Sequence, residues 1–339
     1  MTPASDEEFM RRALALAERG WGQTAPNPMV GAVVARDGVI VGEGWHERYG
    51  EAHAEVIALA HAGSAADGAT LYVTLEPCSH FGKTPPCSDA VVAARVGRVV
   101  FATRDPGARS GGGAEKLRAA GIDVDTGVLE ADARELNAPF FHSFASDRPW
   151  VTLKLAVSID GAIADSVRGR AWLTNEESRA EVHRIRANVD AIAVGATTYV
   201  TDRPELTVRG PLQPRVQPMR VVFDPEAKLS AGRTSVLEEA HGVTFVRVAD
   251  LGAALRALRA RGIRSLLVEG GASLASALLD AGLVDRLVIF QAPIVLGGGA
   301  LAAFGATVAR RAEHVRRLPV LRRQAFGDDL MTIYALNAV

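Results

Sequence analysis

The sequence has few cysteines, few aromatic residues and no long apolar run. Two cysteines in 339 residues cannot make a disulfide framework, and clustered thiols in such a chain more often bind metal or take part in chemistry. Aromatic residues make up 6% and the net charge is −1, so the composition does not favour a nucleic-acid or anionic-membrane surface. No window approaches the roughly 18 apolar residues of a spanning helix, and residues 1–12 lack the apolar region of a signal peptide. We therefore expect a cytoplasmic protein without a membrane-spanning helix.

What the sequence does contain is enough material for two α/β domains. Apolar residues make up 48% and charged residues 23%, which is typical of a globular protein. Alternating strand and helix patterns run to about residue 145, and they begin again after the segment SFASDRPW at 143–150. We therefore predict one domain over residues 1–145 and a second over residues 146–339.

Individual elements can be placed within both halves. Ser5–Glu8 has the form of a capping box ahead of a helix over 9–19, and the turn at 36–38 predicts a hairpin. The rest of the first half predicts helices over 51–62 and 87–97 and strands over 69–77 and 98–103. The second half predicts strands over 151–156, 190–195, 220–223, 244–248, 265–271 and 286–296, and helices over 176–188, 251–261 and 273–281.

Both cysteines lie in one proline-rich stretch, EPCSHFGKTPPC at residues 76–87. Upstream, His53 and Glu55 open a predicted helix, while Cys78 and Cys87 each lie at or near the start of another. One imidazole and two thiolates supply three zinc ligands and leave the fourth tetrahedral position for water, as in catalytic zinc sites. Glu55 is close enough to His53 to move the proton of that water without binding the metal. A solvated helix face and two core cysteines are the alternative interpretation.

The order of these residues is typical of zinc nucleobase deaminases, whose pattern is H-x-E followed by P-C-x-x-C. Here eight residues, rather than two, separate the cysteines. The segments HAEVIAL, VTLEPCSHFGKTPPC and PNPMVGAVV resemble the deaminase half of the bifunctional riboflavin-biosynthesis deaminase–reductase family, which has this long loop. The resemblance implies a cytidine-deaminase-like N-terminal domain with zinc on His53, Cys78 and Cys87, and with Glu55 as proton shuttle.

The same resemblance implies a small-molecule substrate, a diaminopyrimidinone ribosylamine 5′-phosphate that loses a ring amino group as ammonia. It assigns Asn27, His80 and Lys83 to substrate binding, and a lysine suits the phosphate. The family usually has Asp-Pro-Asn after the last deaminase strand, where this chain has Gly107 in place of the asparagine. We expect the glycine-rich loop 105–113 to be mobile without substrate, and Gly107→Asn to lower the KM of deamination.

The second half has two glycine clusters where backbone N–H groups could approach a ligand. VEGGASLASALL at 268–279 predicts a strand, a Gly-Gly turn and a helix, and VLGGGA at 295–300 is the second cluster. Plain connecting turns and a surface loop are the alternatives, and no G-x-G-x-x-G follows the first strand. Lys154 lies inside the apolar strand VTLKLAV, where an ammonium is costly to bury without a partner unless the strand is at an edge.

The segments LKLAVSIDG, WLT, HRIRA, VGATTYVTDRPELTVR, VVFD, LLVEGG and LGG are similar, in this order, to the reductase half of the same family, so the resemblance covers about residues 7–335. It implies a C-terminal dihydrofolate-reductase-like domain that uses NADPH to reduce ribosyl to ribityl, and a homodimer or higher homo-oligomer formed through this domain. Lys154 and Asp202 are the candidates beside the reacting sugar. The implied cofactor contacts are Ala156, Trp172, Thr198, Asp202, Gly271, Ala272, Ser273, Leu274, Ala275, Ser276 and Ala277. The implied substrate contacts are Arg170, Arg186, Leu206, Arg209 and Glu269.

Three positions in this half depart from the family pattern. Arg170 and Pro225 stand where serine is usual, and Arg203 replaces the second aspartate of an Asp-Asp-Pro motif. These changes leave open a zinc deaminase whose second domain is a degenerate reductase used for oligomerisation. A nucleic-acid-editing deaminase is a third interpretation, against which the charge and the aromatic content argue. The favoured interpretation is an enzyme of two active halves that binds neither nucleic acid nor membrane.

Overall fold

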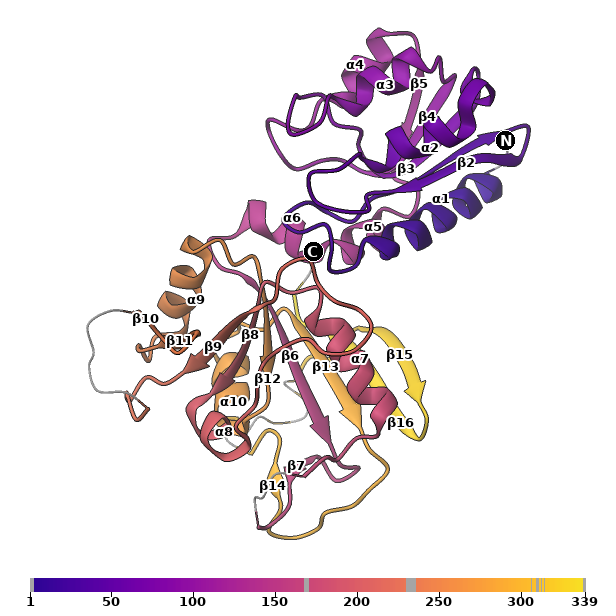
Figure 1. Cartoon of the computed structure of the whole chain (residues 1–339). Helices are drawn as coiled ribbons and strands as arrows, with labels where there is room; N and C mark the ends of the chain where they lie inside the picture. Colours follow the sequence, from indigo (N-terminus) through magenta and orange to yellow (C-terminus); the bar gives the residue numbers. More distant parts are fainter. Residues whose placement is uncertain are drawn as a thin grey trace. The chain divides into compact units, whose positions relative to one another are not determined.

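The computed structural model of the chain describes residues 3–167, 171–229, 236–305, 307–308, 311, 313 and 315–337. It separates into two compact units (Figure 1). The first unit runs to Ala145 and the second begins at Ser146, with the short segment Pro214–Val216 grouped with the first. Each unit has its own sheet and its own buried apolar clusters. In the described part of the chain, no helix has the length and apolar character needed to cross a membrane.

A five-stranded sheet in the order β2-β1-β3-β4-β5 forms the centre of the first unit. The predicted hairpin is confirmed, since β1 and β2 pair antiparallel and Asp37 and Gly38 both have positive φ, 51° and 80°. Strands β3, β4 and β5 run parallel, so their carboxyl ends lie at one edge. The strands are β1 (Gly31–Arg36), β2 (Val39–Trp45), β3 (Thr70–Leu75), β4 (Arg98–Thr103) and β5 (Asp123–Thr126).

Helices cover both faces of this sheet, because alternate strand residues are apolar on both sides. Val34 packs with α2, α3 and α4, whereas its neighbour Val33 packs with α1 and α5. The capping box predicted at Ser5–Glu8 is wrong, because the helix already includes Pro3, and Asp6 pairs with Arg98 at 2.9 Å. The helices are α1 (Pro3–Ala17), α2 (Ala54–Ala62), α3 (Cys87–Ala93), α4 (Gly113–Ala119), α5 (Glu130–Leu136) and α6 (Ala138–Ala145).

Glycine residues let α2 lie directly against β2. A Cβ on Gly42 would be 2.2 Å from the Ala58 carbonyl oxygen, and one on Gly44 would be 2.5 Å from the Ala54 carbonyl oxygen. No side chain fits at such distances, so the helix backbone reaches the strand only because both positions are glycine. The first turn of α2 is thereby held close to the sheet.

The second unit is built on a nine-stranded sheet in the order β10-β11-β9-β8-β12-β6-β13-β16-β15. The six central strands of the sheet, β11, β9, β8, β12, β6 and β13, run parallel to one another. Antiparallel strands flank them, with β10 on one side and β16 and β15 on the other. The strands are β6 (Trp150–Val157), β8 (Ala191–Gly195), β9 (Met219–Phe223), β10 (Leu237–Ala240), β11 (Val243–Val246), β12 (Ser265–Glu269), β13 (Arg286–Gln291), β15 (Val320–Phe326) and β16 (Asp329–Ala335), with a separate pair β7 (Ala162–Ala164) and β14 (Leu301–Ala302).

Helices lie on both faces of this sheet as well. Val182 of α7 packs on Phe290 and Met331, while Leu255 and Leu278 lie in the cluster on the opposite face. The prediction of strand over 286–296 is too long, since β13 ends at Gln291, and the C-terminal hairpin of β15 and β16 was not predicted. The helices are α7 (Glu176–Arg186), α8 (Ala196–Asp202), α9 (Leu251–Ala260) and α10 (Ala272–Asp280).

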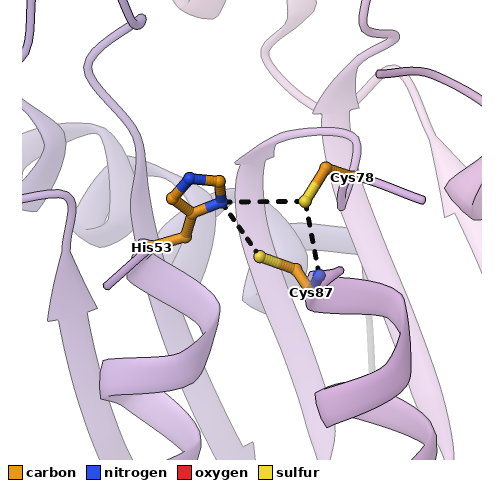
Figure 2. A group of neighbouring side chains, drawn as sticks. All are labelled: His53, Cys78 and Cys87. Atoms are coloured by element: carbon orange, nitrogen blue, oxygen red, sulfur yellow. Dashed lines mark hydrogen bonds between the residues drawn. The ribbon is translucent and has the colours of Figure 1, made fainter. Parts of the chain in front are cut away.

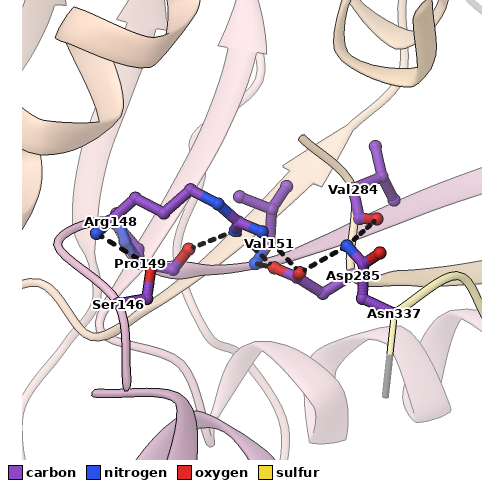
Figure 3. Close-up of polar contacts among 7 residues, drawn as sticks. All are labelled: Ser146, Arg148, Pro149, Val151, Val284, Asp285 and Asn337. Carbon is purple, nitrogen blue, oxygen red and sulfur yellow. Dashed lines mark hydrogen bonds and ion pairs between the residues drawn. The ribbon is translucent and has the colours of Figure 1, made fainter. Parts of the chain in front are cut away.

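One buried carboxylate ties the start of the second unit to its last strands (Figure 3). Both terminal nitrogens of Arg148 lie 2.6 Å from the carboxylate oxygens of Asp285. Asp285 also accepts the backbone N–H of Val151 at 2.8 Å and the side-chain amide of Asn337 at 2.9 Å. Burial opposes ionisation of Asp285, but these donors hold its pKa below the usual range. The chain entering β6, the residue before β13 and the residues after β16 thus share one anchor.

Candidate active sites

The three predicted metal ligands converge in the first unit (Figure 2). His53 is the N-cap of α2, Cys78 follows β3, and Cys87 begins α3. His53 Nδ1 lies 3.1 Å from Cys87 Sγ and 3.7 Å from Cys78 Sγ, and the three ligand atoms all lie within 4.8 Å of one another. Two sulfurs and one imidazole nitrogen at these distances fit a tetrahedral zinc ion with one open position.

The protonation of the cluster also suits a cation. Hydrogen bonds from Cys87 and His53 lower the pKa of Cys78 to about 4, despite its burial. The pKa of Cys87 shifts in the opposite direction. Its hydrogen bond with Cys78, together with burial, raises the pKa of Cys87 far above the usual range. The hydrogen bond with Cys78 raises the pKa of His53. One thiolate therefore lies beside the imidazole, and a divalent cation would displace the remaining thiol proton.

Glu55 lies in the first turn of α2, immediately beside this cluster. Its side chain is buried, with 3% exposure, and contacts Cys87. Burial raises the pKa of Glu55 to about 7, although His53 opposes the shift. A carboxyl group that can both take and give a proton near neutral pH is suited to general acid–base catalysis. Glu55 is not part of the ligand set, which among the described residues comprises His53, Cys78 and Cys87.

The cluster opens into a cavity of about 500 Å³ in the first unit. The predicted substrate residues Asn27, His80 and Lys83 all line it. Lys83 Nζ lies 4.2 Å from the centre of the Tyr49 ring, and His80 Nδ1 is buried without a hydrogen-bond partner in the described part of the chain. Residues that line the cavity but were missed from the sequence include His46, Tyr49, Thr84, Asp105, Ser110 and Phe140.

His46 fixes the orientation of Asn27. Its Nδ1 lies 3.1 Å from the Ala52 carbonyl, which can only accept, so Nδ1 carries the proton. Nε2 then accepts from the Asn27 amide nitrogen at 3.2 Å, and the Asn27 side-chain oxygen is left as the atom that can accept from a ligand. Burial lowers the pKa of His46, in agreement with a neutral ring. The motif GWHERYG carries this histidine, but nothing in its spacing indicates a contact with Asn27.

The loop at Gly107 has a defined path against the cysteine loop. Ser79 donates from its backbone N–H to the Ser110 carbonyl at 3.2 Å and from Oγ to the Gly111 carbonyl at 2.5 Å. A Cβ on Gly113 would lie 1.8 Å from the Pro77 carbonyl oxygen, so only glycine fits there. A Cβ on Gly107 would lie 2.2 Å from Ser110 Oγ. The mobility expected for this loop stays a prediction, but it would have to break these contacts.

The second unit contains a separate cleft of about 1590 Å³. The predicted residues that line it are Lys154, Ala156, Trp172, Arg186, Thr198, Asp202, Arg209, Glu269, Gly271, Ala272, Ser273, Leu274 and Ala277. Leu206, Ala275 and Ser276 are buried and are not among the lining residues. Arg170 lies outside the described residues.

Three ionisable side chains meet at the inner wall of this cleft. Lys154 of β6 and Glu269 of β12 are register partners on adjacent parallel strands. Arg186 of α7 binds both carboxylate oxygens of Glu269, at 2.6 and 2.7 Å. Burial opposes the charge of Glu269, but Arg186 holds the pKa of that carboxyl below its usual range. Burial lowers the pKa of Lys154, so this amine gives up its proton more readily than a surface lysine.

The Gly-Gly turn presents the start of α10 to the cleft. Gly270 and Gly271 have φ of +71° and +79°, and a Cβ on Gly271 would lie 2.8 Å from Thr198 Oγ1. No side chain caps α10, so its first N–H groups are available to an anionic part of a nucleotide. The other glycine cluster differs, because Asp160 accepts the N–H groups of Leu296 and Gly297 at 3.1 and 2.7 Å.

Comparison with known proteins gives matches over both units. Residues 3–103 match the family described as the cytidine and deoxycytidylate deaminase zinc-binding region, and residues 149–331 match the RibD C-terminal domain. The riboflavin biosynthesis protein RibD of Aquifex aeolicus is 42% identical over 97% of this chain and 98% of that protein. The RibD protein of Escherichia coli is 40% identical over 87% of this chain and 89% of its own length.

Solved structures match over the same extent. Acinetobacter baumannii RibD, form 1, superposes with a TM-score of 0.87 at 34% identity, covering 98% of this chain and 99% of that one. A diaminohydroxyphosphoribosylaminopyrimidine deaminase/5-amino-6-(5-phosphoribosylamino)uracil reductase from Thermotoga maritima gives a TM-score of 0.86 at 35% identity, again covering 98% and 99%. Both the deaminase-like and the reductase-like half of the chain are therefore matched together, in one relative.

Proposed function

This chain belongs to the RibD family, the bifunctional deaminase–reductases of riboflavin biosynthesis, and from that premise we propose which of its residues carry the two reactions. The first reaction is hydrolytic deamination of 2,5-diamino-6-ribosylamino-4(3H)-pyrimidinone 5′-phosphate. The second is reduction of the ribosyl side chain, giving 5-amino-6-(ribitylamino)uracil 5′-phosphate. The observation that carries the assignment is the cluster of His53, Cys78 and Cys87 beside the buried carboxyl of Glu55.

In the first unit, His53, Cys78 and Cys87 would hold zinc, which when bound makes a water molecule acidic enough to react near neutral pH. Glu55 takes the proton from that water on its carboxylate and delivers it to the departing ring amine, because its pKa of about 7 allows both transfers. Lys83 at the cavity wall binds the phosphate of the substrate as a point charge.

The pyrimidine ring is held by Asn27 and His80, two polar residues of the same cavity. Asn27, oriented by His46, offers an acceptor oxygen to a ring N–H or amino group. His80 offers Nδ1, which is buried without a partner in the described residues and would gain one from the substrate. Both residues line the cavity that is also lined by His53, Cys78 and Glu55, so they bring the reacting carbon to the metal.

In the second unit, NADPH supplies the hydride. The uncapped start of α10 binds its phosphates, while Thr198, Trp172 and Ala156 line the cleft around the rest of the cofactor. Lys154 and Asp202 lie at the sugar, where Lys154 holds or releases a proton as charge develops. Arg209 and the Arg186–Glu269 pair contact the substrate. The family resemblance adds Arg170 and Leu206 to the proposed substrate contacts. It also adds Ala275 and Ser276 to the proposed cofactor contacts.

We further propose that the deaminase domain is residues 1–145 and the reductase domain is residues 146–339. The division of the chain at Ala145 and Ser146 supports this boundary. A cytoplasmic location and a homo-oligomer joined through the reductase domain rest on the family resemblance. Sedimentation of the whole chain and of the second domain alone tests the oligomer.

The test uses purified chain, the diamino substrate and NADPH. We expect about one zinc per chain, release of one ammonia per substrate, and oxidation of one NADPH per ammonia released. Ammonia release without NADPH oxidation, in protein that also fails to reduce the supplied deaminated intermediate, would favour the degenerate-reductase alternative. Absence of stoichiometric zinc, with ammonia release unaffected by Cys78→Ala, would contradict the assignment of the first unit.

A further inference from the structure

Two side chains of α7 hold the backbone of the loop that follows α8. His183 Nδ1 accepts a hydrogen bond from the backbone N–H of Arg209 at 3.1 Å. Arg186, one turn further along the helix, donates from its guanidinium to the carbonyl oxygen of Thr207 at 3.0 Å. Residues three apart lie on the same face of a helix, so α7 contacts this loop at two points that are two residues apart.

The loop has no regular secondary structure of its own to define its path. Residues 203–209 form neither helix nor strand, and Arg203 and Leu206 have φ of +45° and +53°, a region that residues other than glycine rarely adopt. The Val208 side chain is buried, with 4% exposure, and Leu206, with 1% exposure, anchors one point of the loop in the core. Beyond it, the backbone N–H of Val208 donates to the Gln217 side chain at 3.2 Å. Beyond the buried Val208, the bond to His183 is the contact that holds the backbone N–H of Arg209 itself.

The contact also determines which nitrogen of His183 carries the proton. A backbone N–H can only donate, so Nδ1 must accept and the proton must lie on Nε2. Burial, followed by the charges of Arg186 and Arg209, lowers the pKa of His183, while Glu269 and Glu205 oppose the shift. These are the charged groups that face the ring from its own helix, from the end of β12 and from the loop. A protonated ring would turn a second N–H toward the N–H of Arg209 and lose the bond.

We propose that His183 is a positioning residue of the reductase, which sets the path of residues 207–209 and so presents Arg209 to the cleft. This inference rests on the proposed function, in which Arg209 contacts the substrate. The Arg209 guanidinium is paired with Glu205 and lines the cleft, so its place depends on the backbone that carries it. Loss of the contact weakens substrate binding more than the hydride-transfer step, because His183 itself does not have to touch the reacting atoms.

Two variants test the proposal with the deaminated intermediate as substrate. His183→Leu removes the acceptor, and we expect the KM of reduction to rise about tenfold, the cost of one lost hydrogen bond, with little change in kcat. His183→Asn keeps an acceptor oxygen near the position of Nδ1 and should restore most of the affinity. In the wild type the KM should also rise as the pH falls through the depressed pKa of His183, and this rise should be absent in His183→Asn. Zinc content and ammonia release by the same preparations report that the chain is folded.

A fall in kcat at constant KM in His183→Leu, or the same pH dependence in His183→Asn, would overturn the proposal. A wild type that oxidises no NADPH would instead contradict the proposed function. In that case hydrogen–deuterium exchange of residues 203–212, which needs no substrate, still tests whether His183 holds the backbone of this loop. Exchange should be faster in His183→Leu than in His183→Asn, and equal rates would overturn the role of His183 whatever the activity.

Discussion

Arg148 and Asp285 form a two-point ion pair in which 1% of the aspartate side chain and 16% of the arginine side chain are exposed. The segment 143–150, predicted from the sequence as a domain boundary, is therefore not uniform. Its residues from Ser146 onward belong to the second unit, and Arg148 among them binds the carboxylate that also binds Asn337. Any separation of the two domains has to fall before Arg148.

The first prediction is that Arg148→Met destabilises the second domain by about 3 kcal/mol, because it leaves the Asp285 carboxylate buried and unpaired. Urea unfolding of the fragment 146–339 measures this. The double variant Arg148→Met with Asp285→Asn should recover part of the loss, since the amide needs no counter-ion. Equal urea midpoints for the wild type and Arg148→Met would show that the pair contributes nothing.

The second prediction concerns the independence of the two sites. Glu55→Gln keeps the size of the side chain but removes the proton carrier, so ammonia release should fall by about 10²- to 10⁴-fold while zinc is retained. Reduction of the supplied deaminated intermediate should continue at the wild-type rate. If a folded, zinc-loaded Glu55→Gln protein failed to reduce that intermediate, the assignment of two separate sites would be wrong.

The third prediction reverses an expectation drawn from the sequence alone. Gly107→Asn was expected to lower the KM of deamination, but its Cβ would lie 2.2 Å from Ser110 Oγ and 3.1 Å from Asp105 Oδ1. The single variant must move the Ser110 hydroxyl, which lies at the cavity wall, and we expect its KM to rise. Gly107→Asn combined with Ser110→Gly should lower the KM below that of the single variant, with Ser110→Gly alone as the control. A lower KM in the single variant would restore the original expectation.

The fourth prediction is a trade between stability and activity at Lys154. Lys154→Met removes a buried amine whose charged form is disfavoured by desolvation, which lowers its pKa, so the free energy of unfolding should rise by about 1 kcal/mol while NADPH oxidation is lost. The folded pKa of Lys154 lies below its unfolded value of 10.5, so the wild type gains stability as the pH rises toward that value. The advantage of the variant should therefore be larger at pH 7 than at pH 10, and an advantage that grows with pH would contradict this account. The surface lysine of the Lys116–Asp89 pair offers the control, Lys116→Met, whose effect should be small.

The sequence predicted elements best where periodicity was strong and turns were marked by glycine. Strand β4 has the predicted bounds of 98–103, and the hairpin forms at Asp37 and Gly38. The C-terminal hairpin was missed because β15 is largely exposed and rich in arginine, so its residues lack the apolar alternation of a strand. The capping box failed because α1 already includes Pro3, so Ser5 lies inside the helix and is not its N-cap.

The candidate sites were predictable only where a motif carries them. His53, Glu55, Cys78 and Cys87 are recognisable by order and residue type, and the structure brings the three ligands together. His46 and His183 could not be recognised in this way, because each acts through a contact with a distant segment. His46 contacts the Asn27 side chain, and His183 contacts the Arg209 backbone. Such contacts depend on the packing of separate elements, and no local pattern in the sequence records them.

The close approach of α2 to β2 at Gly42 and Gly44 also has a consequence for inherited variation. These positions carry no chemistry, yet any replacement must push away the helix whose first turn holds His53 and Glu55. A substitution there would be recorded as a deaminase defect with the reductase intact, although no catalytic group has changed. In a survey of natural variants these two glycines would therefore be counted with the active-site residues, and a cell that carried such an allele would accumulate the undeaminated substrate.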